Sequence, residues 1–248
     1  MKFKLVTVTA IAAAALAAGA AHANTVTVLP GGAWTNPAGE NSGGGSSAIT
    51  GTNAHSGNGS IELFGDRTRF VLGDLYSPAS NLGLLSDFTD LAFDWQIAAD
   101  SISALDPDYS PALRITFWSG GVKDEFVWEA AYNGLYGAAT DPGVWYSTSS
   151  SSTFYKRSLG NELDERTISS WLSTVSPDAY VSAIYIGVGS SAGSKYHAFA
   201  DNVVANGTTY NFEIAGKGVP EPSTWALMIL GFGAVGAAVR GQRRRAVA

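Results

Sequence analysis

The chain has 248 residues, of which 46% are hydrophobic and 15% are charged, and none is cysteine. The lack of cysteine excludes disulfides, cysteine-ligated zinc, iron–sulfur clusters and thiol nucleophiles. Residues 24–218 alone hold nine Lys and Arg against 20 Asp and Glu, a formal charge of −11. A segment this acidic is repelled by phosphate backbones, so we expect no nucleic-acid partner.

Residues 1–23 have the three parts of a secretory signal peptide. Two lysines precede an apolar stretch, Leu5–Ala21, and small residues, Ala21 and Ala23, occupy the positions that signal peptidase reads. We therefore expect export of the protein, with cleavage by signal peptidase before Asn24. The alternative is an ordinary buried helix at the N-terminus.

Residues 24–218 are predicted to form a single domain of β-strands. A first strand is expected over Thr25–Leu29. Residues 36–60 are rich in Gly, Ser and Asn and poor in apolar groups, so we expect a flexible loop there. Alternation of apolar and polar residues over 91–97 then predicts a half-buried strand.

The same alternation continues in residues 112–118 and 125–132, which Ser119-Gly120-Gly121 is expected to join as a hairpin. Further strands are predicted at 60–64, 68–72, 153–157, 180–188, 196–205 and 209–214. One short helix is predicted after Thr167, because apolar residues recur at helical spacing from there to Val175. About ten short strands separated by turns favour an all-β fold, an antiparallel β-sandwich of jelly-roll type.

A triplet near the end of this domain, Asp201-Asn202-Val203, carries a first resemblance. Together with the apolar run before it and Asn211-Phe212-Glu213 after it, the triplet is similar to the closing strands of carbohydrate-binding jelly-roll modules. In such modules a calcium ion often lies near this strand, held by carboxylate and backbone oxygens. The resemblance implies Asp201 as a calcium ligand.

Aromatic and polar side chains of these strands predict a polysaccharide-binding site. Sugar recognition uses aromatic rings against the C–H faces of pyranoses, and Asp, Asn, Gln or Arg for the hydroxyl groups. Trp118 belongs to this set because it shares its predicted face with polar residues. The candidate residues are Trp118, Trp145, Tyr146, Asp94, Gln96 and Arg114. The alternative is that these side chains close a second hydrophobic layer.

A pair of catalytic carboxyl groups is one candidate site, because secreted β-sandwiches include glycoside hydrolases. These enzymes need two carboxyl groups roughly 5–9 Å apart. Glu125 and Glu129 share one face of a predicted strand, about 13 Å apart. We interpret them as a solvated or salt-bridged polar face, with Arg114 or Asp94 as the cross-strand partner. The domain is therefore predicted to be non-catalytic, with a self-associating matrix protein and a secreted glycan hydrolase or lyase as alternatives.

The C-terminus carries a second hydrophobic segment. Residues 223–239 predict a single transmembrane helix of marginal length, and Arg243, Arg244 and Arg245 follow it. A basic cluster at this end favours a cytoplasmic tail and an external domain. Trp225 is expected at the outer interface of the membrane.

The order of these features resembles the PEP-CTERM protein-sorting signal, in its Pro-Glu-Pro-x-x-Trp-Ala variant. The match begins with Pro220, Glu221 and Pro222 and continues through Trp225 to the basic end. The resemblance implies that residues 219–248 are a sorting signal recognised at the proline–glutamate–proline tripeptide by exosortase, a membrane enzyme of Gram-negative bacteria that make exopolysaccharide.

This resemblance implies an exported protein of the cell surface or extracellular matrix, transiently anchored in the inner membrane through residues 223–239. The expected partners are signal peptidase, exosortase and an extracellular polysaccharide. A plain single-pass anchor that is never processed is the alternative.

Overall fold

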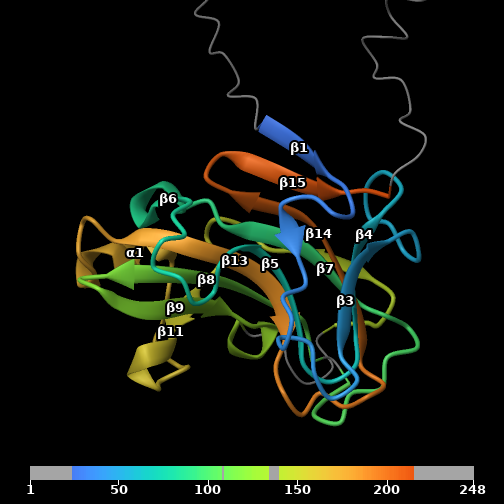
Figure 1. Cartoon of the computed structure of the whole chain (residues 1–248). Coiled ribbons are helices and arrows are strands. Elements are labelled where there is room, and N and C mark those ends of the chain that lie inside the picture. The colour runs from blue at the N-terminus through green and yellow to red at the C-terminus, as the bar shows by residue number, and fades with distance from the viewer. Residues whose placement is uncertain (1–23, 108, 134–139, 215–248) are drawn as a thin grey trace, which may run out of the picture.

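Two β-sheets pack face to face in the computed structural model, which describes residues 24–107, 109–133 and 140–214 (Figure 1). Sheet A consists of β1 (Asn24–Val28), β3 (Ser46–Thr50), β4 (Ser60–Phe64), β7 (Ala92–Ile97), β10 (Trp145–Ser147), β14 (His197–Ala205) and β15 (Thr208–Phe212). Sheet B consists of β2 (Trp34–Thr35), β5 (Thr68–Gly73), β6 (Gly83–Leu84), β8 (Ala112–Ser119), β9 (Val122–Trp128), β11 (Phe154–Lys156), β12 (Glu165–Arg166) and β13 (Tyr180–Val188). The predicted β-sandwich is confirmed.

Sheet B is antiparallel throughout its described strands, in the order β12-β11-β9-β8-β13-β5-β2, with β6 beside β13. The predicted hairpin joins β8 to β9, and Gly120 and Gly121 adopt positive φ angles of 58° and 78° in its turn. Glycine reaches this left-handed region without the strain that a side chain would add. In sheet A, β14 lies between β4 and β7.

The predicted antiparallel pairing does not hold at one edge of sheet A. There β1 pairs in parallel with β15, with Asn24 opposite Thr208 and Val28 opposite Phe212. Alternation shows that a segment is a strand, but it carries no information on the direction of the neighbouring strand. The position of β1 beside β15 is therefore a property that only the tertiary structure shows.

The core lies between the two sheets, and strand alternation supplies it from both sides. Phe93 and Trp95 of β7 face Trp128 of β9 across the interior, with ring centroids 5.2 and 5.9 Å from that indole. Residues fully buried in this core include Trp34, Trp95, Trp128, Trp171, Phe93, Phe117, Phe126, Phe154 and Phe212. The alternating faces predicted for the strands are thus confirmed, and the opposite faces remain for polar side chains.

The prediction of a flexible loop over residues 36–60 is wrong in one five-residue stretch near its middle. Residues 46–50 form strand β3, which pairs with β4 and places Ile49 directly opposite Ile61. Ile49 is buried in the core. A segment with so few apolar residues is ordered because β4 satisfies its backbone groups and one isoleucine reaches the core.

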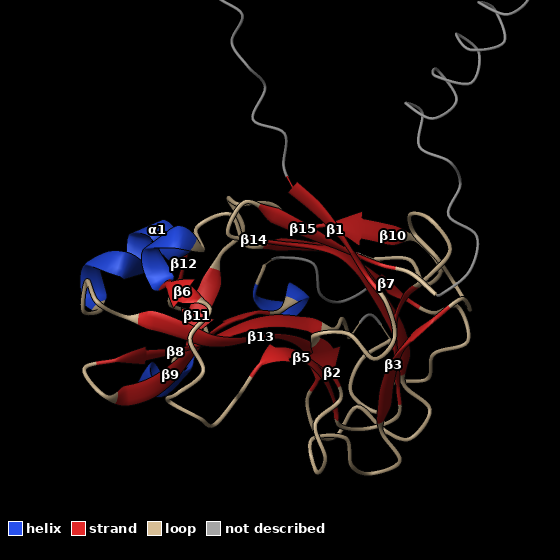
Figure 2. Ribbon diagram, turned by 45° about the horizontal axis from the view of Figure 1, so that its top comes forward, coloured by secondary structure: helices blue, strands red, loops and turns tan. Residues whose placement is uncertain are grey.

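The predicted helix is confirmed but short. Helix α1 spans Ile168–Trp171, and a 3₁₀ turn over Leu172–Thr174 follows it (Figure 2). Thr167 caps the helix, because its side chain accepts a hydrogen bond from the Ser170 amide. The predicted strand 125–132 also ends early, at Trp128, and residues 130–132 form a 3₁₀ turn.

The signal peptide and the sorting signal, residues 1–23 and 219–248, lie outside the described residues. Within the part of the chain that the structure describes, no helix has the length and apolar character needed to cross a bilayer. The predicted span over residues 223–239 therefore stays a prediction.

Candidate functional site

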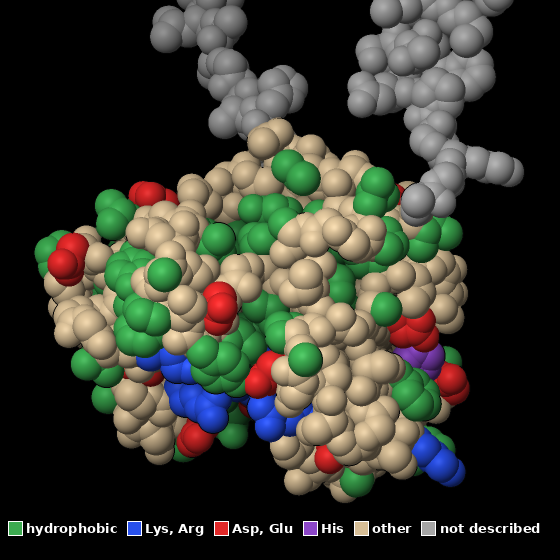
Figure 3. Space-filling view, viewed as in Figure 1, with side chains coloured by type: hydrophobic (Ala, Val, Ile, Leu, Met, Phe, Trp, Pro, Cys, Tyr) green, Lys and Arg blue, Asp and Glu red, His purple; other side chains and the backbone are tan. Residues whose placement is uncertain are grey.

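A cleft of about 640 Å³ opens on the outer face of sheet B, the face turned away from the core. Strands β5, β8, β9 and β13 supply its floor, and loops complete its walls. Figure 3 shows Lys and Arg side chains gathered in the lower part of this view, with Asp and Glu beside them. Within the described chain, five cationic and three anionic side chains and two tyrosines line the cleft.

Strand alternation explains why these polar side chains share one face. In β5, Arg69 precedes the core residue Phe70, so its side chain points outward. In β13, Tyr185 lies between two core isoleucines and points to the same side. The register of the sheet places Tyr185 directly opposite Arg114 of β8. The floor of the cleft is therefore determined by the order of the strands.

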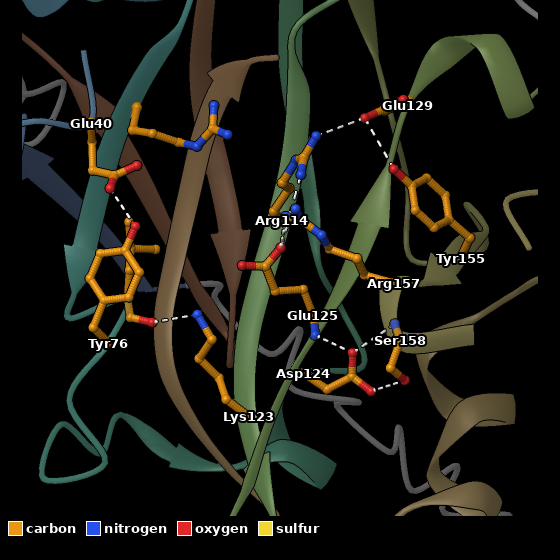
Figure 4. Close-up of polar contacts among 12 residues, drawn as sticks. Glu40, Tyr76, Arg114, Lys123, Asp124, Glu125, Glu129, Tyr155, Arg157 and Ser158 are labelled. Carbon is orange, nitrogen blue, oxygen red and sulfur yellow. Dashed lines mark hydrogen bonds and ion pairs between the residues drawn. The ribbon is translucent and has the colours of Figure 1, made fainter. Parts of the chain in front are cut away.

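Arg114 is the centre of a buried ion-pair network (Figure 4). Its Nη2 lies 2.8 Å from Glu129 Oε1 and its Nη1 lies 3.9 Å from Glu125 Oε2. Arg157 donates to the same Glu125 oxygen at 2.9 Å, and the Tyr155 hydroxyl donates to Glu129 at 3.2 Å. The interpretation of both glutamates as a salt-bridged face paired with Arg114 is confirmed.

This network also sets the protonation of its members. Burial lowers the pKa of Arg114, but the adjacent Tyr185 and the two glutamates outweigh it and raise that pKa above its ordinary value. Burial and the charge of Glu129 raise the pKa of Tyr155. Arg114 is therefore cationic and Tyr155 neutral at physiological pH.

Arg69 and Arg114 lie on either side of Tyr185. Their guanidinium carbons are 5.2 and 6.0 Å from the centre of its ring, within reach of a cation–π interaction. Arg69 Nη1 donates to the carbonyl oxygens of Thr68 at 2.7 Å and Val188 at 2.6 Å. Burial lowers the pKa of Arg69, because water is excluded from its charge.

Tyr76 stands at the mouth of the cleft and is 60% exposed. Its hydroxyl donates to Glu40, which also pairs with Arg67 at 2.9 Å. The Lys123 ammonium lies 4.7 Å from the centre of the Tyr76 ring and donates to the Leu75 carbonyl oxygen at 3.2 Å. An exposed aromatic ring next to several N–H donors is an arrangement that can bind a sugar ring.

Of the six residues predicted to bind sugar, Arg114 lines this cleft. Trp118 lies on the same outer face of β8, but it is half-buried near the end of the strand and outside the lining. Its cross-strand neighbours are Lys123 and Tyr180.

Three more of the six gather on the outer face of sheet A. The Asp94 carboxylate lies 3.0 Å from His55 and accepts a hydrogen bond from Asn202 at 2.8 Å. The Trp145 ring packs against the His55 ring, with centroids 4.6 Å apart. Gln96 lies directly opposite Trp145 and donates to a backbone carbonyl at 2.8 Å. Their side-chain partners are therefore His55, Asn202 and backbone or amide groups of neighbouring loops, and not one another.

Tyr146, the sixth residue, packs against the core. Its ring stacks on Trp95 with centroids 5.1 Å apart, and its hydroxyl accepts a hydrogen bond from the Asp141 amide. The structure therefore does not bring the six residues into one site. Alternation predicted which side chains avoid the core, but the two sheets turn their outer faces in opposite directions.

Asp201 is fully buried and joins three segments. One carboxylate oxygen accepts from the Asn202 and Phe212 amides, at 2.8 and 3.1 Å. The other accepts from the amide and hydroxyl of Ser56, at 3.2 and 3.1 Å. Burial raises the pKa of Asp201, and these hydrogen bonds oppose that shift.

Several side-chain oxygen atoms gather close to Asp201. Calcium needs six to eight oxygen ligands, whereas three side-chain oxygens here, from Asp201, Asn202 and Asn211, converge on the Ser56 hydroxyl at 3.0–3.2 Å. No group of three or more His, Asp or Glu side chains that could hold a metal occurs in the described residues. Calcium at Asp201 stays a prediction, and these contacts assign the residue a structural role.

The sequence contained a signal for two of the residues that the site prediction omitted. Arg69 and Tyr185 both lie in predicted strands, on the face opposite the apolar residues, as Arg114 does. Tyr76 carried no such signal, because it belongs to the turn after β5, where the Asp74 carboxylate accepts from its amide.

Residues 218–245 match the family model of the PEP-CTERM protein-sorting motif. The resemblance predicted from Pro220, Glu221 and Pro222 is confirmed. The motif indicates a bacterial protein that is exported and sorted to the cell surface by exosortase.

Two solved structures of carbohydrate-binding modules are similar to the chain. One, described under "Structural basis for the promiscuous specificity of the carbohydrate-binding modules from the beta-sandwich super family", is 11% identical with a TM-score of 0.35; the match covers 69% of this chain and 56% of that one. The other, the CBM22-1 xylan-binding domain from Paenibacillus barcinonensis Xyn10C, is 14% identical with a TM-score of 0.31, covering 68% and 82%. The chain thus spans little more than half of the first structure. No curated protein matches the chain.

Proposed function

We propose that this protein is a non-catalytic component of the cell surface or extracellular matrix of a Gram-negative bacterium, and that its β-sandwich binds extracellular polysaccharide. The observation that carries the proposal is the cleft on sheet B. Its volume of about 640 Å³ lies in the range of small-ligand sites, and it is open along the sheet surface. The proposed site replaces the six residues predicted from the sequence. Of those six, Arg114 is retained, because it lines the cleft.

Four residues of the cleft have a part in this proposal. The exposed Tyr76 ring covers the C–H face of a pyranose at the mouth. Arg69, Arg114 and Lys123 donate hydrogen bonds to sugar oxygens along the floor. The ion pairs of Arg114 hold the donors in place before a ligand arrives, which lowers the entropy lost on binding.

The state of the carboxylates supports a non-catalytic role. Glycoside hydrolysis needs one protonated and one ionised carboxyl group facing the bond that breaks. Glu125 and Glu129 are both held in ion pairs with arginines. Glu165, whose pKa burial raises to about 7, lies outside the lining of the cleft. A hydrolase or lyase remains the alternative, and release of reducing or unsaturated ends would reveal it.

The proposed route to the surface begins with cleavage before Asn24. In this proposal the mature chain begins at Asn24, which lies in strand β1. Residues 223–239 then hold the protein in the inner membrane until exosortase acts on residues 219–248. Sorting of this kind supports a function outside the cell, where polysaccharide is abundant.

Affinity electrophoresis of the full-length protein in mild detergent, through gels containing different polysaccharides, tests the proposal. We expect one or more polymers to retard the protein, and Tyr76→Ala to reduce the retardation with an unchanged melting temperature. Tyr132→Ala, an exposed tyrosine outside the cleft lining, is the matched control. Equal retardation of wild type and Tyr76→Ala would place binding elsewhere. Absence of retardation with growth of particle mass in static light scattering would favour the self-associating matrix protein.

A further inference from the structure

We infer that the cleft on sheet B binds an acidic polysaccharide, and that Arg69 binds the anionic group of its sugar residues. This inference rests on the proposed function and names the ligand class of the same site. It comes from the distribution of charge in and around the cleft, which differs from that of the rest of the chain.

The cleft is positive in a negative domain. Five cationic side chains line it against three carboxylates, whereas residues 24–218 as a whole carry a formal charge of −11. Cationic side chains still outnumber carboxylates when Glu129 and Lys156, which form ion pairs with lining residues, are included. A positive cleft with low-dielectric walls concentrates anions from solution.

Most of these cations are already neutralised by partners. Arg67 pairs with Glu40 at 2.9 Å, and Arg157 pairs with Glu125 at 2.9 Å. Arg114 pairs with Glu129, as described above. In the described part of the chain, no carboxylate oxygen lies within 4.0 Å of the charged nitrogens of two lining cations, Arg69 and Lys123.

Arg69 is the stronger candidate of the two because it is buried and rigid. Only 8% of its surface is exposed, and Nη1 alone uses two backbone carbonyls. A guanidinium carries five N–H groups, and the other three of Arg69 make no hydrogen bond within the described residues. A buried charge without a counter-ion costs free energy of desolvation, which a bound anion recovers.

The shape of the donor group suits a carboxylate or a sulfate. The planar guanidinium presents parallel N–H groups that match two oxygens of one anion. Lys123 adds a second charge near the exposed Tyr76 ring, at a distance of 4.7 Å. A sugar could therefore stack on the tyrosine while its acidic group meets Arg69 deeper in the cleft.

The central comparison is between polygalacturonate and its carboxyl-reduced form, which differ in the acidic group alone. Binding of the full-length protein in mild detergent is measured by affinity electrophoresis with polygalacturonate, its carboxyl-reduced form, dextran sulfate and xylan. We expect retardation by polygalacturonate that weakens with salt, and little by the carboxyl-reduced polymer or xylan. Retardation by dextran sulfate but not by polygalacturonate would overturn a carboxylate ligand in favour of a sulfated one.

Arg69→Gln tests the named residue, because it removes the charge and keeps most of the side-chain length. We expect the affinity for the acidic polymer to fall about tenfold or more, as for the loss of a charge-assisted hydrogen bond. Arg166→Gln is the control for charge, since Arg166 pairs with Asp164 outside the cleft lining. If Arg69→Gln does not fold, judged by its melting curve, Lys123→Gln at the cleft rim takes its place and should bind several-fold less.

The outcomes separate the inference from the proposed function. Equal binding to polygalacturonate and to its carboxyl-reduced form, unchanged by Arg69→Gln or Lys123→Gln, would overturn the inference and leave polysaccharide binding intact. Binding to none of the polymers would overturn both. Binding to the acidic polymer that is lost in Arg69→Gln and retained in Arg166→Gln would support both.

Discussion

Single buried polar side chains decide how the segments of this sandwich are joined. Asp201 connects residue 56, β14 and β15 through four hydrogen bonds, although its own carboxylate is inaccessible to water. Arg114 connects β8 to β9 and β11 in a similar way. Both residues lie on strands, where alternation predicts the face of a side chain but not the contacts that it makes there.

Asp201→Ala should lower the free energy of unfolding by about 2–3 kcal/mol, because it leaves buried amide donors without an acceptor. Asp87→Ala, at an exposed aspartate, is expected to change it by less than about 0.5 kcal/mol. Urea unfolding measures both. We also expect a chelator to leave the melting temperature unchanged; a fall on chelation, reversed by calcium, would contradict the structural role assigned to Asp201.

Glu165 should make stability depend on pH. Burial, with a contribution from the Glu129 charge, raises the pKa of Glu165 to about 7, above the 4.5 expected in the unfolded chain. The folded state therefore binds more protons between these values, so the stability that this group contributes at low pH is lost as pH rises through about 7.

In Glu165→Gln this loss between pH 5 and pH 8 should become smaller, as urea unfolding at both pH values would show. The magnitude is expected to be modest, since the side chain is partly solvated. Glu162→Gln, at an exposed neighbouring position, should leave the pH profile as in the wild type. An unchanged profile in Glu165→Gln would contradict the raised pKa.

At the scale of elements, β3 is a strand that the amino-acid composition did not predict. Its residues Ser46–Thr50 come from a segment rich in Gly and Ser, and their order depends on pairing with β4. Strand β1 likewise depends on β15 for its place, in a parallel pair at the sheet edge. Helix α1, unlike these two strands, depends mainly on residues close together in the chain. Thr167 caps it, and two of its apolar residues are buried.

Ile49→Ala tests whether β3 contributes to stability. We expect a loss of about 2–3 kcal/mol, at the lower end for a buried isoleucine because β3 is an edge strand. Thr52→Ala, in the loop directly after β3, should cost less than about 1 kcal/mol. Chemical unfolding of both variants provides the measurement. Equal small effects would support the flexible loop that the composition predicts.

At the scale of the whole molecule, the sandwich and the sorting motif are separate in sequence. The motif concerns localisation, and the sandwich concerns ligand binding. The motif over residues 218–245 indicates where the protein goes. In the proposed function, the cleft on sheet B is where the protein binds its ligand.

Replacement of Pro220, Glu221 and Pro222 by alanine should prevent processing in a host that contains exosortase. We expect the variant to keep its higher mass and to remain in the membrane fraction, because the enzyme no longer recognises the tail. Alanine replacement of Ser149, Ser150 and Ser151, an exposed stretch of the sandwich, is the control and should be processed normally. Normal processing of the tripeptide variant would contradict the assignment. Immunoblots of cell fractions measure both outcomes.

The sequence by itself indicated that the protein is sorted to the cell surface. It also predicted most strands, the hairpin at Gly120 and the side of each strand that meets the core. These features depend on residues close together in the chain, such as an order of motifs or a period of two. Only the tertiary structure decided that Arg69, Arg114 and Tyr185 share one cleft while Asp94 and Trp145 lie on the opposite sheet. The physical reason is that alternation specifies the face of a strand, whereas the neighbours on that face follow from which strands pair, and pairing is fixed by packing between segments far apart in sequence.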